Sequence, residues 1–193
     1  MNVYVDGEYA LSLFADTILQ FKLNISDSIT QEKIEELRKF DEYIFAKKLA
    51  YDFLSYRNRS TSEIKKKLVS KKISDRTIDE VVKHLEEIKL LDDAKFAKEF
   101  LQAKVNKKAY GRRVIQQKLV QKGVDRKVAE ALIQDEMNED EQLQTAGDIL
   151  KKYLSKNKSL EKIKLKQKAY ALLLRRGFDY EVINAVISKN LHE

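Results

Sequence analysis

The apolar positions between residues 110 and 132 recur at the spacing of two short helices separated by a corner. The two apolar stripes consist of Ile115, Leu119 and Val120, followed by Val128, Ala131 and Leu132. Gly123 lies between them, where a helix C-terminus favours a residue in the left-handed conformation. Asp125 follows, with a side chain suited to capping the next helix. The pattern therefore predicts a helix–corner–helix unit.

The same pattern occurs twice more along the chain. The upstream copy comprises Ile64, Leu68, Val69 and Ile73 and then, with one residue dropped at Ser74, Asp75, Ile78 and Val81. The downstream copy comprises Ala169, Leu173, Leu174, Gly177, Phe178, Asp179, Val182, Ala185 and Val186. A further helix precedes each copy and reads Ala, two residues, Phe or Ile, then Leu, starting from Ala50, Ala97 and Ala146. We therefore expect three tandem three-helix units that bury apolar surface partly against one another.

The N-terminal segment predicts a different structure. Two β-prone runs, residues 3–5 and 9–13, flank Asp6 and Gly7, and Asp-Gly is a strong signal for a hairpin turn. An isolated hairpin is marginal in water, so we expect its apolar side chains to pack on a helix near residues 18–21.

Capping signals set the expected boundaries of the helices. One helix should open at Ser28 or Thr30 and run through Lys39, and Ser60 with Glu63 forms a capping box for the second helix of the first unit. In the third unit the second helix should be longer. Ile149 and Leu173 are 24 residues apart, whereas the equivalent separation is 19 residues from Phe100 to Leu119 and 15 from Phe53 to Leu68.

The predicted fold class is all-α, with three tandem three-helix repeats in an elongated array after a small N-terminal β-hairpin and helix segment. The expected parts are residues 1–40 as the hairpin and helix cap, 41–91 as repeat 1, 92–138 as repeat 2 and 139–193 as repeat 3.

Composition supports a helical chain. Of the 193 residues 43% are hydrophobic and 36% are charged, and the absence of proline removes the strongest helix breaker. With no cysteine there is no disulfide framework and no thiolate metal site or nucleophile. We expect a cytoplasmic protein without a membrane span, because neither a signal-peptide pattern nor an apolar run of about 18 residues occurs.

The net charge of +7 is distributed in blocks. Basic and acidic side chains number seven and one in residues 57–72, seven and none in residues 104–122, and ten and one in residues 151–176. By contrast, residues 130–148 carry seven acidic side chains and no basic one. Each basic block begins at or just before the second helix of its unit, so stacked units should bring three basic patches into line.

The sequence shows no arrangement of side chains that is typical of a catalytic or metal-binding site. The five glycines are too far apart for a phosphate-binding loop, and neither His84 nor His192 has a partner at metal-ligand spacing. Asp92 and Asp93 are best explained as helix caps, and the acidic stretch around Glu139 as a solvated joint. We expect no cofactor, no metal and no enzymatic activity, and therefore a binding protein.

The basic blocks supply the candidate binding residues. A single exposed lysine usually serves solubility, but a helix with seven cations and no anions repels itself unless a polyanion neutralises it. Arginine adds a forked donor for phosphate or carboxylate. The candidate contacts are Arg57, Arg59, Lys66, Lys67, Lys71, Lys107, Lys108, Tyr110, Arg112, Arg113, Lys118, Lys122, Lys162, Lys166, Arg175 and Arg176. No set of side chains suits the reading of particular bases, so contacts to the DNA backbone without sequence preference are expected.

Three motifs resemble a known family. They are Ser60-x-x-Glu63-Ile64 leading to Leu68, Leu90-Leu91-Asp92-Asp93-x-Lys95-Phe96-Ala97, and Gly111-x-Arg113-x-Ile115-x-x-x-Leu119-x-x-Lys122-Gly123-Val124. Together they are similar to the signatures of RecX, the regulator of the RecA recombinase. The resemblance implies tandem three-helix repeats without catalytic activity. It further implies binding in the groove of the RecA filament on DNA, inhibition of filament growth, ATP hydrolysis and strand exchange, and roles in recombination, DNA repair and the SOS response.

Two other functions remain open from the residues alone. Small three-helix units also resemble helix-turn-helix domains, so a general nucleic-acid-binding module is one alternative. The other is an adaptor whose acidic and basic faces bind a protein and never contact DNA. The expected partners are the RecA filament and single- or double-stranded DNA, and the protein is expected to be monomeric.

Overall fold

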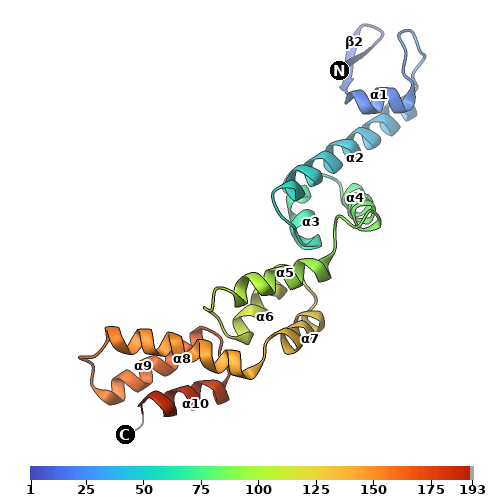
Figure 1. Cartoon of the computed structure of the whole chain (residues 1–193). Helices are drawn as coiled ribbons and strands as arrows, with labels where there is room; N and C mark the ends of the chain where they lie inside the picture. The colour runs from blue at the N-terminus through green and yellow to red at the C-terminus, as the bar shows by residue number, and fades with distance from the viewer. Residues whose placement is uncertain (192–193) are drawn as a thin grey trace. The chain divides into compact units, whose positions relative to one another are not determined.

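The computed structural model describes residues 1–191, which form one two-stranded hairpin and ten helices (Figure 1). The chain divides into two compact units, Met1–Asp92 and a second unit that begins at Asp93. Each unit contains two clusters of buried apolar side chains.

The first unit begins with the predicted hairpin. Strand β1 (Asn2–Val5) pairs antiparallel with β2 (Glu8–Ser12). Asp6 and Gly7 connect them with φ angles of 51° and 86°. Positive φ at both central residues is the conformation that Asp-Gly favours in a two-residue hairpin turn, so the local signal was sufficient here.

The hairpin packs on the helix that follows it, as expected. Helix α1 (Ala15–Phe21) places Ile18 and Phe21 against the buried Leu11 of β2. Tyr9 of the same strand is 60% exposed and does not take part in this packing.

Helix α2 (Gln31–Ser55) is continuous, so the expected helix end at Lys39 was wrong. Thr30 caps its start by accepting a hydrogen bond from the Lys33 backbone N–H at 3.3 Å. No glycine or proline occurs between residues 31 and 55, so nothing in the sequence interrupts the backbone ladder.

Two adjacent carboxylates of α2 bind it to its neighbours. Asp41 accepts hydrogen bonds from the Phe14 backbone N–H and the Thr17 hydroxyl, both at 2.7 Å, and thereby joins the start of α1 to α2. Glu42 accepts from the Ser74 hydroxyl at 2.6 Å and from the Ser74 N–H at 3.3 Å. One long helix therefore holds the hairpin segment on one side and the first three-helix repeat on the other.

The other helices of the first repeat are α3 (Thr61–Val69) and α4 (Asp75–Glu87). Ser60 accepts a hydrogen bond from the Glu63 backbone N–H at 3.2 Å, which confirms the predicted start of α3. The end of α2 and the helices α3 and α4 enclose one apolar cluster.

The second unit contains six helices in its described residues. They are α5 (Asp93–Val105), α6 (Arg112–Gln121), α7 (Arg126–Glu136), α8 (Glu139–Lys156), α9 (Lys162–Arg175) and α10 (Tyr180–Leu191). Helices α5 to α7 enclose one apolar cluster and α8 to α10 enclose another. Helix α9 has 14 residues, against 10 in α6 and 9 in α3, which confirms the longer second helix of the third repeat.

The corner between the second and third helices is the same in all three repeats. Lys72, Gly123 and Gly177 have φ angles of 61°, 91° and 84°, so the left-handed residue lies where the sequence predicted it. Asp125 caps α7 by accepting backbone hydrogen bonds at 2.8 and 3.3 Å. Ser74 is the N-cap of α4, in the place of Asp125, so the match of Asp75 to Asp125 was wrong and no residue has to be dropped at this corner.

The predicted apolar stripes of the second repeat were partly wrong. Val120 is 42% exposed, Val128 is 46% exposed and Ala131 is also exposed. Ala129 and Ile133 are buried in place of the latter two, in the apolar cluster of α5 to α7.

Candidate functional site

Two of the candidate arginines hold the link between α2 and α3. Arg57 donates hydrogen bonds of 3.0 and 2.9 Å to the two carboxylate oxygens of Glu63. The Arg59 guanidinium lies 3.8 Å from the centroid of the Phe53 ring and donates to the Phe53 carbonyl at 3.2 Å. Burial lowers the pKa of Arg59, and the charge of Arg57 adds to this effect. Both side chains therefore have structural partners.

The lysines of the first repeat are more accessible. Lys66 and Lys71 are exposed on α3 and just after it. Lys67 is half-buried, and its Nζ lies 5.5 Å from the centroid of the Phe53 ring. Lys66 and Lys71 are thus the candidates of this block that can reach a partner.

The start of α6 lies against the corner between α9 and α10. The Gly111 N–H donates to the Arg176 carbonyl at 2.9 Å, and the Arg113 N–H donates to the Gly177 carbonyl at 3.1 Å. A Cβ atom on Gly111 would lie 2.3 Å from the Gly177 carbonyl oxygen, and one on Gly177 would lie 2.5 Å from the Val114 nitrogen. Only glycine at both positions permits the two backbones to approach this closely. We call this contact the glycine junction.

Two more candidate arginines bind groups of the chain close to the glycine junction. Arg112 is half-buried and donates to the Met137 carbonyl at the end of α7. Arg113 forms an ion pair with Asp179, with 2.7 Å between Nε and Oδ1. Both guanidinium groups therefore have partners within the chain, and the phosphate contact expected of these arginines stays a prediction.

Two further candidate cations lie over an aromatic ring. Lys118 Nζ lies 5.2 Å and the Arg176 guanidinium carbon 5.8 Å from the centroid of the Tyr110 ring. Arg176 also donates to the Ala109 carbonyl at 3.0 Å, which places the corner after α9 against the link before α6. We define the Tyr110 cluster as Lys107, Lys108, Tyr110, Lys118, Arg175 and Arg176.

The outer members of the Tyr110 cluster are accessible. Lys107, Lys108 and Arg175 are exposed. Of the other candidates, Lys122 is half-buried just after α6, and Lys162 and Lys166 are exposed on α9. The structure therefore brings together two of the three basic blocks that the sequence indicated.

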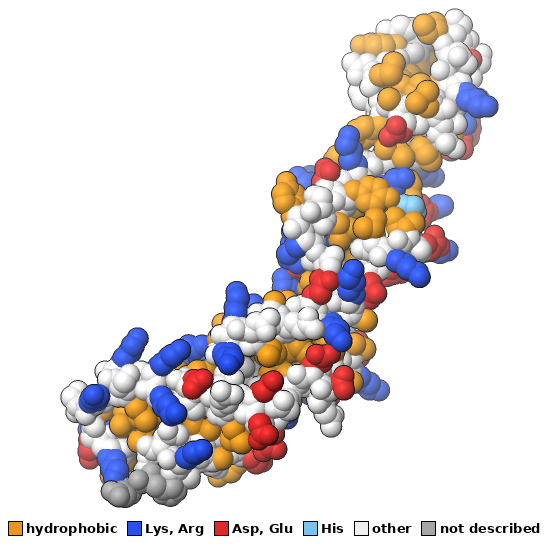
Figure 2. Space-filling view, viewed as in Figure 1, with side chains coloured by type: hydrophobic (Ala, Val, Ile, Leu, Met, Phe, Trp, Pro, Cys, Tyr) orange, Lys and Arg blue, Asp and Glu red, His pale blue; other side chains and the backbone are white. Residues whose placement is uncertain are grey.

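Charge distinguishes the two units. Residues 1–92 carry 17 acidic and 16 basic side chains, whereas residues 93–193 carry 14 acidic and 22 basic ones. Figure 2 shows basic and acidic side chains interspersed over the visible surface. The excess positive charge thus belongs to the part of the chain that contains the Tyr110 cluster.

Comparisons with known proteins match different parts of the chain to the same family. Family models of the first, second and third RecX three-helix domains match residues 46–85, 92–133 and 139–187. The regulatory protein RecX of Bacillus subtilis (strain 168) is 33% identical over 192 residues, which cover 100% of this chain and 72% of the relative. The chain belongs to the RecX family.

Other members and solved structures agree. The regulatory protein RecX of Streptococcus mutans is 34% identical over 179 residues, covering 93% of this chain and 68% of the relative. A crystal structure of a regulatory protein RecX has a TM-score of 0.79 at 24% identity, covering 96% of this chain and 92% of the other. A crystal structure of RecX from Lactobacillus salivarius has a TM-score of 0.71 at 25% identity, with coverages of 77% and 96%.

The glycine junction joins the second and third RecX domains. Gly111 and Arg113 belong to the second domain, and Gly177 and Asp179 belong to the third. Sequence reasoning attributed Arg113 to DNA contact and gave Asp179 only a place in the repeat pattern. The sequence offers one signal for the glycine junction. Gly111 precedes α6, whereas the equivalent position of the first repeat is the capping residue Ser60.

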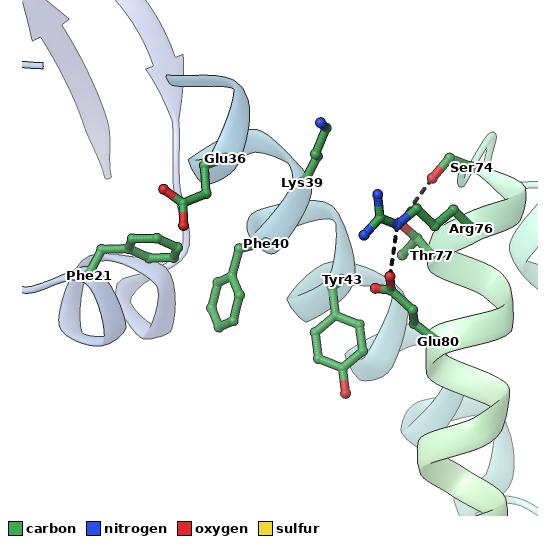
Figure 3. A pocket seen from close by; sticks show the side chains of 9 residues that line it. All are labelled: Phe21, Glu36, Lys39, Phe40, Tyr43, Ser74, Arg76, Thr77 and Glu80. Atoms are coloured by element: carbon green, nitrogen blue, oxygen red, sulfur yellow. Dashed lines mark hydrogen bonds and ion pairs between the residues drawn. The ribbon is translucent and has the colours of Figure 1, made fainter. Parts of the chain in front are cut away.

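A groove of about 630 Å³ lies next to the first RecX domain, in the first unit. Figure 3 shows the rings of Phe21, Phe40 and Tyr43 along α1 and α2, facing an ion pair of Arg76 and Glu80 on α4. The lining also contains one further acidic and one further basic side chain, so its charges balance. The groove is therefore unsuited to a polyanion.

His84 is half-buried and shares a hydrogen bond of 3.0 Å with the Tyr51 hydroxyl, so its ring has a partner within the first repeat. His192 lies outside the described residues. Among residues 1–191 no cluster of three or more acidic or histidine side chains is placed to bind a metal ion. Over the same range no helix combines the length and the apolar character needed to cross a membrane.

Proposed function

We propose that this protein regulates the RecA recombinase by binding the RecA filament on DNA through the Tyr110 cluster. The observation that carries the proposal is the convergence of two basic segments from different RecX domains. Through the glycine junction, the link before α6 and the corner after α9 form one cationic surface. A surface built from two domains can contact more successive phosphates than a single helix end.

The chemistry of this surface favours contact with the phosphate backbone. Lys107, Lys108 and Arg175 are exposed, and flexible ammonium groups bind phosphate without reading bases. Lys66 and Lys71 of the first domain form a second exposed set. The protein acts by occupancy rather than by catalysis, and it inhibits filament growth, ATP hydrolysis and strand exchange in the cytoplasm.

The experiment compares three targets: RecA on single-stranded DNA with ATP, RecA alone, and bare DNA. The proposal requires tightest binding to RecA on DNA, together with a fall in the ATP turnover of RecA as this protein is added. Equal affinity for bare and RecA-coated DNA would instead identify a general nucleic-acid-binding module. Equal affinity for RecA with and without DNA would identify an adaptor that contacts protein only.

A further inference from the structure

The link between α5 and α6 carries two exposed lysines of the Tyr110 cluster, Lys107 and Lys108. Its start is joined to α5, because the Lys108 N–H donates to the Val105 carbonyl at 2.8 Å. Lys108 has φ 43°, a left-handed conformation that is unfavourable for a residue with a Cβ atom. Such a conformation persists where surrounding contacts hold it. The contacts on the rest of the link therefore decide where these two lysines lie.

Arg176, from the third RecX domain, contacts three consecutive residues of the link. Its guanidinium donates to the Ala109 carbonyl at 3.0 Å, and the guanidinium carbon lies 5.8 Å from the centroid of the Tyr110 ring. Its backbone carbonyl accepts a hydrogen bond from the Gly111 N–H at 2.9 Å. One residue of the third domain therefore contacts every position between Lys108 and the start of α6.

Arg176 has a fixed position in its own domain. It is the C-cap of α9, and its N–H donates to the Leu172 carbonyl at 3.1 Å in the last turn of that helix. Helix α9 packs into the apolar cluster of α8 to α10 through the buried Ala169 and Leu173. The packing of the third domain thus sets the place of a link that belongs to the second.

The surroundings of Arg176 suit a positioning role better than a direct contact with phosphate. Its side chain is half-buried, and its guanidinium already binds a carbonyl and lies near a ring. The adjacent Arg175, in contrast, is exposed. A segment that is already ordered loses less conformational entropy when it binds, so holding the link raises affinity without adding a contact.

We propose that Arg176 is a positioning residue, through which the third RecX domain holds Lys107 and Lys108 of the second domain in the conformation that contacts phosphate. The inference rests on the proposed contact with DNA and adds a dependence of one domain on another. Loss of the Arg176 side chain should therefore weaken binding through these two lysines, and not only through the loss of its own charge.

Limited proteolysis with the lysine-specific endoproteinase Lys-C tests whether Arg176 holds the link. Arg176→Met removes the guanidinium but keeps an unbranched side chain, and it should raise the rate of cleavage after Lys107 and Lys108 by on the order of tenfold. Cleavage after Lys127 in α7 should stay as in the wild type, because only the link is loosened. The matched control is Arg175→Met, which removes the same charge one position away and should be cleaved like the wild type.

Binding to RecA on single-stranded DNA tests the positioning role in a double-mutant cycle. Arg176→Met should weaken binding by on the order of fivefold in the otherwise unchanged protein. Once Lys107 and Lys108 are both glutamine, Arg176→Met should weaken binding no more than Arg175→Met does, because no lysine is left to position. Arg175→Met should have the same effect in both backgrounds, since its side chain acts independently. A merely structural role would give Arg176→Met equal effects in both backgrounds.

The outcomes separate this inference from the proposed function. Faster cleavage after Lys107 and Lys108 alone, with an effect on binding that requires these lysines, would support it. An unchanged cleavage rate in Arg176→Met, or cleavage that also rises after Lys127, would overturn it. Equal effects of Arg176→Met in the two backgrounds would overturn it as well and leave the phosphate contact standing. Failure of the wild-type protein to bind RecA on DNA would refute the proposed function, and the positioning role with it.

Discussion

Replacing Gly111 with alanine should open the glycine junction. The backbone of Gly111 has φ −81° and ψ 171°, which alanine adopts without strain, so only the added Cβ atom matters. That atom would lie 2.3 Å from the Gly177 carbonyl oxygen and 2.5 Å from the Phe178 nitrogen. Both are backbone atoms and cannot turn away, so the corner after α9 must move.

The cost follows from the contacts that the movement breaks. Two backbone hydrogen bonds join the corner to the start of α6, and each contributes about 0.5 to 1.5 kcal/mol. Alanine is also a poorer N-cap than glycine. We expect a loss of about 2 to 4 kcal/mol in the free energy of unfolding. For a cooperative unit of about 100 residues this lowers Tm by roughly 10 to 20 °C.

Thermal denaturation followed by circular dichroism measures this effect. The matched control is Gly147→Ala in α8, where an added Cβ atom meets nothing within 4 Å. That change should stabilise the helix by about 0.5 to 1 kcal/mol, because glycine is unfavourable in a helix interior. A Tm for Gly111→Ala equal to that of the wild type would refute the close contact between the second and third RecX domains.

Further predictions concern individual side chains. Arg113→Ala and Asp179→Ala should each cost less than about 1 kcal/mol, with a coupling of similar size in a double-mutant cycle, because Arg113 is exposed and Asp179 is only half-buried. Asp125→Ala should cost about 1 kcal/mol through loss of the α7 cap, measured by urea denaturation. Burial raises the pKa of Glu42, but hydrogen bonds from Ser74 and Thr77 outweigh it, so the folded-state pKa is lowered. The stability that Glu42 provides over Glu42→Gln should therefore be present above the unfolded pKa of about 4.3 and decline as pH falls through the folded pKa, in a urea series from pH 7 to 3.

Local signals in the sequence predicted local structure well. Gly123 and Asp125 fix a corner through their own backbone and capping chemistry, and these residues need no distant partner. Similarly, Asp6 and Gly7 suffice for the hairpin turn. The error at Lys39 arose because the helix was expected to end where the first repeat begins, although its sequence contains no breaker there.

The partners that the candidate arginines have within the chain could not be predicted, because they depend on distant contacts. The ion-pair partner of Arg113 is Asp179, 66 positions away, and no local pattern indicates that these two side chains meet. A basic helix start looks the same in sequence whether its arginines face solvent or a neighbouring domain. Lys107 and Lys108, in contrast, lie in a polar link, and the structure leaves both exposed.

The central claim is that the Tyr110 cluster contacts DNA phosphates within the RecA filament. The direct test is a salt titration of binding to RecA on single-stranded DNA with Lys107, Lys108 and Arg175 all changed to glutamine. The matched control changes Lys39, Lys48 and Lys83, which are exposed on the first unit, to glutamine. Each lost phosphate contact flattens the slope of log affinity against log salt by about 0.7 on single strands, so the account predicts a slope reduced by about 2 for the first variant and unchanged for the control. Equal slopes for the wild type and both variants, with folding intact, would contradict it.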